Sequence, residues 1–175
     1  MENIISKFRK YIVLYNSIEH NIINLAVKSF PGIKIYKKHM NSIECFEKNY
    51  LSIFFLMIYN KLHLNKNKIF FYGSINYLIR GIVTCTDNLL DNEEKFLLNV
   101  KNINPDASKS QSIFLIILYQ NLLDSYLDIS IKNKLITIEN KRKIKKILFS
   151  ELFEIGFIES VEEKKIKKFY HLLKS

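Results

Sequence analysis

Apolar residues recur every three or four positions along most of the chain, which is the spacing of amphipathic helices. The first such stretch stops at Pro31 and Gly32, a pair that breaks helices. Ser108 or Ser110 can cap a later helix with its hydroxyl, and Gly156 separates the last two stretches. The pattern therefore predicts an all-α bundle of about six helices. The predicted helices are residues 4–30, 41–64, 69–100, 108–129, 139–153 and 158–173.

The composition supports the same fold class. With 175 residues and 48% hydrophobic residues, the chain has enough apolar material for one buried core, so we predict a single domain over residues 1–175. Only four glycines and two prolines are present, and an all-β fold with many hairpins would need more turn residues. This excludes a sheet-rich architecture.

The cysteines and the N-terminus bear on location. Cys45 and Cys85 have no paired spacing, so they predict neither a disulfide framework nor a zinc site, and we expect a cytoplasmic protein. The first ten residues lack the order of a signal peptide. The apolar stretch 69–86 contains Arg80, so we interpret it as a buried helix and predict no transmembrane segment.

The net charge of +10 raises nucleic acid as a partner. Basic runs lie at residues 132–146 and 164–168, and a basic helical surface binds phosphates in a salt-dependent way. However, the excess is almost all lysine in a chain rich in Ile, Asn, Tyr and Phe, which is the bias of an AT-rich coding sequence. A non-catalytic basic helical protein that binds nucleic acid or another protein is therefore the alternative hypothesis.

The third predicted helix carries a polar stripe on an otherwise apolar surface. Because such a helix is buried on several sides, its stripe must face other polar groups or a wet cavity. Asp87 and Asp91 end the stripe one helical turn apart, and their like charges call for a cation. Two carboxylates suit Mg²⁺, which completes its shell with water and substrate phosphates. The stripe consists of Gly73, Tyr77, Arg80, Thr84, Asp87, Asp91 and Glu94.

Spacing alone leaves other interpretations open for these carboxylates. Asp87 and Asp91 could pair with Arg80 or Lys95 in a structural ion network, or the helix end could already lie in solvent. On the fourth predicted helix, Gln120, Asp124 and Asp128 form a second polar stripe. That stripe is either a source of further metal ligands or the solvent edge of the helix.

Residues 72–95, YGSINYLIRGIVTCTDNLLDNEEK, resemble the first aspartate-rich helix of the class I isoprenoid synthases. This all-helical superfamily contains prenyl diphosphate synthases and terpene cyclases, and its motif is DDxxD. The chain has Asp87-Asn88-Leu89-Leu90-Asp91, with asparagine at the middle position. The paired arginines that follow the motif in chain-elongating synthases are absent here.

The resemblance implies a Mg²⁺-dependent enzyme that ionises an allylic isoprenoid diphosphate for prenyl transfer or terpenoid synthesis. It assigns catalysis and metal binding to Asp87 and Asp91. Family members also carry a second acidic motif and are longer than this chain. The hypotheses are therefore a truncated or divergent member, a subunit completed by another chain or by a second copy, and chance similarity. Substrate binding is assigned to Arg80, Asn88 and Lys109, and further candidate metal ligands are Glu94, Asp124 and Asp128.

Overall fold

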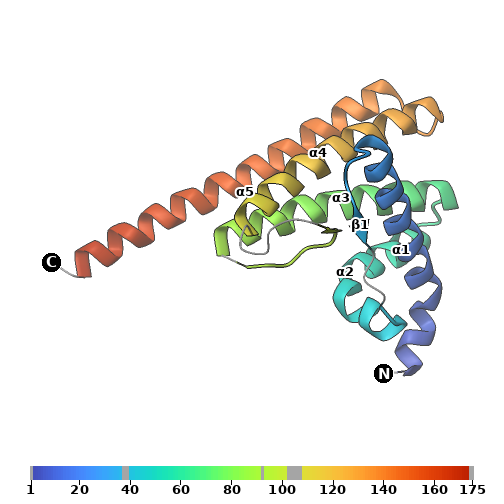
Figure 1. Ribbon diagram of the computed structural model, residues 1–175, viewed down its shortest axis with the longest axis horizontal. Coiled ribbons are helices and arrows are strands. Elements are labelled where there is room, and N and C mark those ends of the chain that lie inside the picture. Colours follow the sequence, from blue (N-terminus) through green and yellow to red (C-terminus); the bar gives the residue numbers. More distant parts are fainter. Residues whose placement is uncertain (1, 37–39, 92, 102–107, 174–175) are drawn as a thin grey trace. The chain divides into compact units, whose positions relative to one another are not determined.

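The computed structural model describes residues 2–36, 40–91, 93–101 and 108–173, with side chains described for 6–36, 40–91, 93–101, 109–154 and 156. In these ranges the chain is all-α, as predicted, but it has five helices rather than about six, together with two very short strands (Figure 1). The elements are α1 (Glu2–Ser29), β1 (Ile35–Tyr36), α2 (Ser42–Lys61), α3 (Lys66–Asp91), β2 (Asn99–Val100), α4 (Ser108–Lys132) and α5 (Ile138–Leu173).

The chain divides into two compact units, Met1–Ser130 and Ile131–Ser175. We call them the N-terminal and C-terminal units and describe each by itself. The predicted single domain over residues 1–175 stays a prediction. The N-terminal unit holds α1, α2, α3 and nearly all of α4, and it contains every residue of the candidate site described below.

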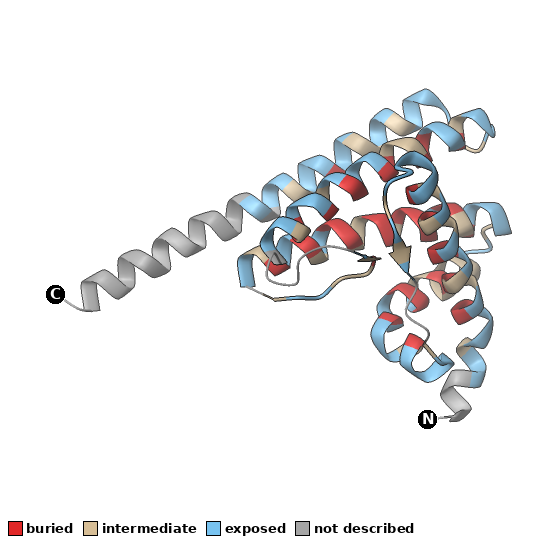
Figure 2. Ribbon diagram, viewed as in Figure 1, coloured by how far each residue is buried: buried red, intermediate tan, exposed pale blue. Residues whose placement is uncertain are grey.

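α3 lies at the centre of the N-terminal unit. It contacts α1 and α2, and Figure 2 shows buried residues along most of its length. The stretch 69–86, predicted to be core, is buried at most of its apolar positions. The rings of Tyr15 on α1 and Tyr77 on α3 lie 5.9 Å apart, and those of Phe71 on α3 and Tyr126 on α4 stack at 6.0 Å. Aromatic contacts thus join α3 to neighbours on two sides.

Two glycines let neighbouring elements approach α3 closely. A Cβ at Gly73 would lie 2.6 Å from the side-chain ends of Ile18 and Leu56. A Cβ at Gly81 would lie 2.4–2.6 Å from three ring atoms of Tyr119, a fully buried residue of α4. Gly73 belongs to the polar stripe predicted on this helix, so the stripe is tightly packed against apolar side chains at that position.

The helix starts follow local capping chemistry. Asn41 caps α2: its Oδ1 accepts from the amides of Ile43 and Glu44, and its own amide donates to Glu44 Oε2. Asn65 accepts from the amide of Lys68 at 2.9 Å, and α3 begins at Lys66, near the predicted start at residue 69. Side-chain oxygens at these positions satisfy amides that have no partner inside the helix.

Two predicted helix boundaries are wrong. The third helix was expected to reach residue 100, but α3 ends at Asp91. The chain instead forms β2, in which Asn99 pairs with Tyr36 and Val100 with Ile35 in an antiparallel register. The predicted break at Gly156 is also absent, because α5 runs continuously from Ile138 to Leu173. A glycine inside a helix costs only about 1 kcal/mol relative to alanine, which neighbouring helix formers outweigh.

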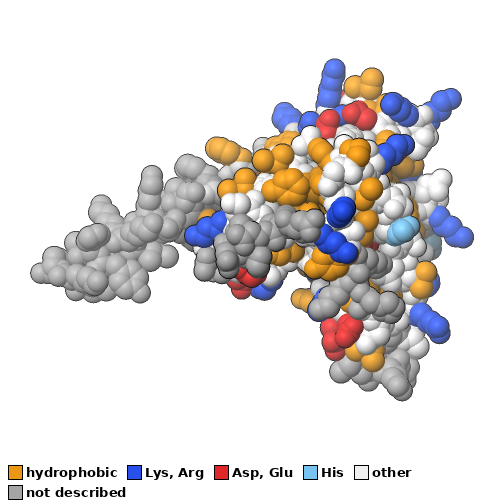
Figure 3. Space-filling view, in the orientation of Figure 1, with side chains coloured by type: hydrophobic (Ala, Val, Ile, Leu, Met, Phe, Trp, Pro, Cys, Tyr) orange, Lys and Arg blue, Asp and Glu red, His pale blue; other side chains and the backbone are white. Residues whose placement is uncertain are grey.

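One helix in the described residues is long and apolar enough to cross a membrane by length and composition alone. It is α4, over Lys109–Lys132, and 44% of its apolar 18-residue window is buried inside the protein. A core helix of a soluble protein passes the same test. On the face of the molecule shown in Figure 3, lysine and arginine side chains are dispersed among apolar and neutral ones.

Candidate functional site

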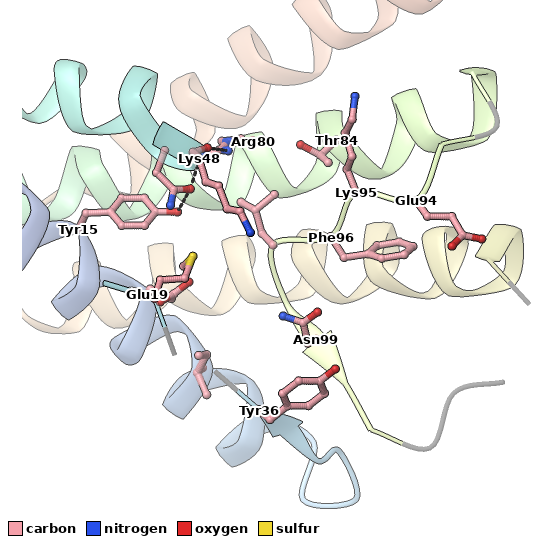
Figure 4. Close-up of a pocket in the computed structure, with 14 residues that line it drawn as sticks. Tyr15, Glu19, Tyr36, Lys48, Arg80, Thr84, Glu94, Lys95, Phe96 and Asn99 are labelled. Atoms are coloured by element: carbon pink, nitrogen blue, oxygen red, sulfur yellow. Dashed lines mark hydrogen bonds between the residues drawn. The ribbon is translucent and has the colours of Figure 1, made fainter. Parts of the chain in front are cut away.

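The N-terminal unit contains a cavity of about 480 Å³. Its walls come from α1, α2, α3 and the segment that leads into β2, with Tyr36 and Met40 completing the lining (Figure 4). Arg80 and Thr84, two members of the predicted polar stripe, line it, so this part of the stripe faces a cavity as expected. The other lining residues are Tyr15, Glu19, Ile23, Lys48, Asn49, Glu94, Lys95, Phe96, Leu97 and Asn99.

Arg80 is held by three hydrogen bonds to α2. Its Nη1 donates to Asn49 Oδ1 at 2.8 Å and to Ser52 Oγ at 3.4 Å, and its Nη2 donates to the carbonyl oxygen of Lys48 at 2.8 Å. The backbone of α2 leaves helical geometry at Asn49, with φ −127° and ψ 18°, next to the carbonyl that Arg80 uses. The guanidinium is therefore fixed in direction at the edge of the cavity.

A buried polar network extends this arrangement to α1. Tyr15 donates its hydroxyl proton to Asn49 Oδ1 at 2.8 Å, and Asn49 Nδ2 donates to the Cys45 carbonyl at 3.0 Å. Burial raises the pKa of Tyr15 far above its ordinary value, while the positive charge of Arg80 opposes that shift. Tyr15 is therefore a neutral donor that orients Asn49, and Asn49 in turn orients Arg80.

The charges around the cavity are mixed. Arg80, Lys48 and Lys95 contribute cations, and Glu19 and Glu94 contribute carboxylates. Lys95 forms an ion pair with Glu93, and the resulting hydrogen bond raises the pKa of Lys95. In contrast, every hydrogen bond that Arg80 makes within the described part of the chain goes to a neutral acceptor.

Asp87 and Asp91 lie just beyond the cavity, on the last two turns of α3. Both carboxylates are exposed, and Asp87 follows Thr84 by three residues, so it continues the face that lines the cavity. Partial burial raises the pKa of Asp87, as do the nearby charges of Asp91 and Glu93, while Lys95 opposes the shift. The two carboxylates therefore repel each other and are not neutralised by Arg80, which bonds to α2.

Asn88 lies between these acids in sequence but points in another direction. Its side chain is only 3% exposed, its Nδ2 donates to the Lys95 carbonyl at 2.8 Å, and its Oδ1 accepts from the Lys95 amide at 3.1 Å. Asn88 was predicted to bind substrate, and the structure shows its side-chain amide hydrogen-bonded to the Lys95 backbone. The remaining predicted site residues are Glu94, Lys109, Asp124 and Asp128.

Among those residues, only Glu94 lines the cavity. Lys109 is exposed in the first turn of α4, Asp124 is half-buried and Asp128 is exposed, and none of the three is part of the lining. Within the residues that the structure describes, no group of three or more His, Cys, Asp or Glu side chains is arranged to hold a metal ion. A metal at Asp87 and Asp91 would therefore take its remaining ligands from water and substrate.

Tyr15, Lys48 and Asn49 are the functional candidates that the sequence interpretation missed. Asn49 was the detectable one, because it is a polar residue on the buried side of a helix that also buries Cys45, Ile53 and Leu56. A buried amide needs hydrogen-bond partners, so its position signals a polar contact. Nothing in the local sequence identifies that partner as Arg80, which lies 31 residues away.

The arrangement can bind an anion inside the cavity and a divalent cation at its edge. No family model, curated protein or solved structure matches this chain. The geometry of the N-terminal unit is therefore the basis for a function. That geometry comprises an oriented arginine, two further cations and a neighbouring pair of carboxylates.

Proposed function

We propose that the N-terminal unit binds an allylic isoprenoid diphosphate together with Mg²⁺ and acts in prenyl transfer or terpenoid synthesis by ionisation of that diphosphate. The observation that carries the proposal is the position of Arg80. This permanently charged side chain lines the cavity, is half-buried, and bonds to neutral groups within the described residues. A cation placed in this way attracts an anionic ligand.

The donor geometry of Arg80 supports an oxyanion such as phosphate. A guanidinium has five N–H donors, and three hydrogen bonds to α2 leave two donors for a ligand. Lys48 lines the same cavity and adds a second positive charge. Arginine together with lysine is a common combination for binding phosphate oxygens, because arginine fixes direction and lysine supplies a mobile charge.

Asp87 and Asp91 would hold the metal. Their spacing and mutual repulsion fit a hard divalent cation, and Mg²⁺ needs only one or two protein carboxylates when a diphosphate supplies other oxygens. Bound there, Mg²⁺ would supply charge neutralisation that favours departure of the diphosphate. The apolar side chains of Ile23, Phe96 and Leu97 line the cavity and limit the access of water to a reactive organic group.

Thermal unfolding in the presence of Mg²⁺ and geranyl diphosphate tests this proposal. At a ligand concentration about 100 times Kd, binding stabilises a protein by ~2.7 kcal/mol, so we expect Tm to rise by roughly 5–10 °C. In the double variant Asp87→Asn, Asp91→Asn, the Mg²⁺-dependent part of this rise should disappear. Glu151→Gln with Glu154→Gln, a pair of exposed acids on α5, is the matched control and should keep the full rise.

The Asp87 variant should not lose stability in the absence of ligand. Because the pKa of Asp87 is raised in the folded protein, its ionised form is the disfavoured one, and stability falls as pH rises through that pKa. Replacing the carboxylate by an amide removes this cost at neutral pH. An absent Mg²⁺-dependent rise in the wild type, or an equal rise in the double variant, would contradict the proposal.

A further inference from the structure

We infer that Asn88 is a positioning residue, which holds residues 94–97 against α3 and thereby sets the affinity of the cavity for diphosphate. This inference rests on the proposed function of the cavity. We call residues 94–97 the cavity wall, because all four of them line the cavity. The contacts at the two ends of the wall carry the argument.

The first contact is the reciprocal pair between Asn88 and the Lys95 backbone. The side-chain amide of Asn88 donates to the carbonyl of Lys95 and accepts from its amide, at 2.8 and 3.1 Å. Asn88 is almost completely buried, so neither bond can be replaced by water without moving the segment. One side chain thus fixes both polar groups of a wall residue.

The second contact lies at the far end of the wall. Leu98 is 1% exposed, and the next residue, Asn99, pairs with Tyr36 in the antiparallel β1–β2 ladder. The Lys101 amide then donates to the Lys34 carbonyl at 2.7 Å. The wall is therefore attached to α3 at Lys95 and to β1 beyond Leu98, and three of its four lining side chains, Lys95, Phe96 and Leu97, lie at or between these attachments.

The chemistry at position 88 requires an amide. An ionised aspartate could still accept from the Lys95 amide, but it has no proton to donate to the Lys95 carbonyl. Its charge would also be buried, because position 88 is only 3% exposed, and burial disfavours an ionised carboxylate. The asparagine that distinguishes this chain from an all-aspartate motif therefore has a structural role that a carboxylate would not fill.

The test uses Asn88→Asp at a pH where the introduced carboxyl is ionised, so that the side chain keeps its shape and its acceptor but has no donor. Binding of inorganic pyrophosphate with Mg²⁺ is measured by calorimetry on the folded protein, and hydrogen exchange is followed over residues 93–98. We expect Kd to rise about tenfold, as for loss of one buried hydrogen bond, and exchange to accelerate. Asn121→Asp is the control: Asn121 also donates to a backbone carbonyl, that of Ile117, but it is exposed on α4 and is not part of the lining.

The outcomes separate the inference from the proposed function. If the wild type fails to bind pyrophosphate, the proposed function and this inference both fail. If the wild type binds, and Asn88→Asp accelerates exchange at unchanged Kd, Asn88 is merely structural and only the inference is overturned. Asn88→Ser, which introduces no charge, gives the same comparison if the aspartate variant does not fold, with a smaller increase in Kd expected.

Discussion

Replacing Arg80 by methionine is expected to weaken diphosphate binding by about 100-fold and to lower the free energy of unfolding by about 2–3 kcal/mol. The first effect follows from the loss of the oriented charge in the cavity. The second follows because the substitution removes three hydrogen bonds, and the Lys48 carbonyl and the Ser52 hydroxyl lose Arg80 as their hydrogen-bond donor. Calorimetric titration with pyrophosphate and Mg²⁺, together with urea unfolding, measures the two effects separately.

Two further variants distinguish charge from orientation. Lys48→Met removes a cavity charge but keeps the backbone carbonyl that accepts from Arg80, so we expect weaker binding at nearly unchanged stability. Arg80→Lys keeps a positive charge but cannot reproduce the guanidinium fork, so binding should remain impaired. Arg9→Met removes an exposed charge from α1 and serves as the control. Wild-type affinity in Arg80→Met would show that the ligand binds elsewhere.

Arg80 shows how much of the candidate site the local sequence pattern predicts. Helical spacing correctly placed Arg80 and Thr84 on one face of α3 and correctly required polar surroundings for them. It could not show that those surroundings are a kinked segment of α2, because the pairing of Arg80 with Asn49 spans 31 residues. The sequence therefore predicts that the residue needs a partner, and only the fold identifies the partner.

The end of α3 shows the opposite case, in which a continuing pattern was misleading. Phe96, Leu97, Leu98 and Val100 extend the apolar spacing beyond Asp91, so the sequence favours a longer helix. The chain leaves the helix because a side-chain contact and a strand pairing compete with that preference. Asn88 holds the Lys95 backbone, and β2 pairs with β1 more than 60 residues earlier in the chain. The Asn88–Lys95 contact spans only seven residues, but the β1–β2 pairing has no signature within a window of ten or twenty residues.

Gly81→Val is expected to lower the free energy of unfolding of the N-terminal unit by about 3 kcal/mol, at the upper end of the usual cost of overpacking. The position has no room for a side chain, because even a Cβ would overlap the Tyr119 ring at 2.4 Å. Tyr119 is completely buried on α4 and cannot swing into solvent. Gly32→Val is the matched control, since a Cβ there meets nothing within 4 Å, and its effect should stay within about 0.5 kcal/mol.

The partner substitution Tyr119→Leu tests whether overlap with the Tyr119 ring causes the loss of stability in Gly81→Val. Alone, it should destabilise the unit by about 2–4 kcal/mol, because it leaves a cavity where the ring packed. Combined with Gly81→Val, it should cost less than the sum of the two, by about 1–3 kcal/mol, because the valine then occupies part of the space vacated by the ring. Strict additivity in the urea-unfolding cycle would contradict the contact. Since Gly81 follows Arg80 directly, the double variant should also recover part of any pyrophosphate affinity that Gly81→Val loses, which links the packing of α3 on α4 to the orientation of the arginine.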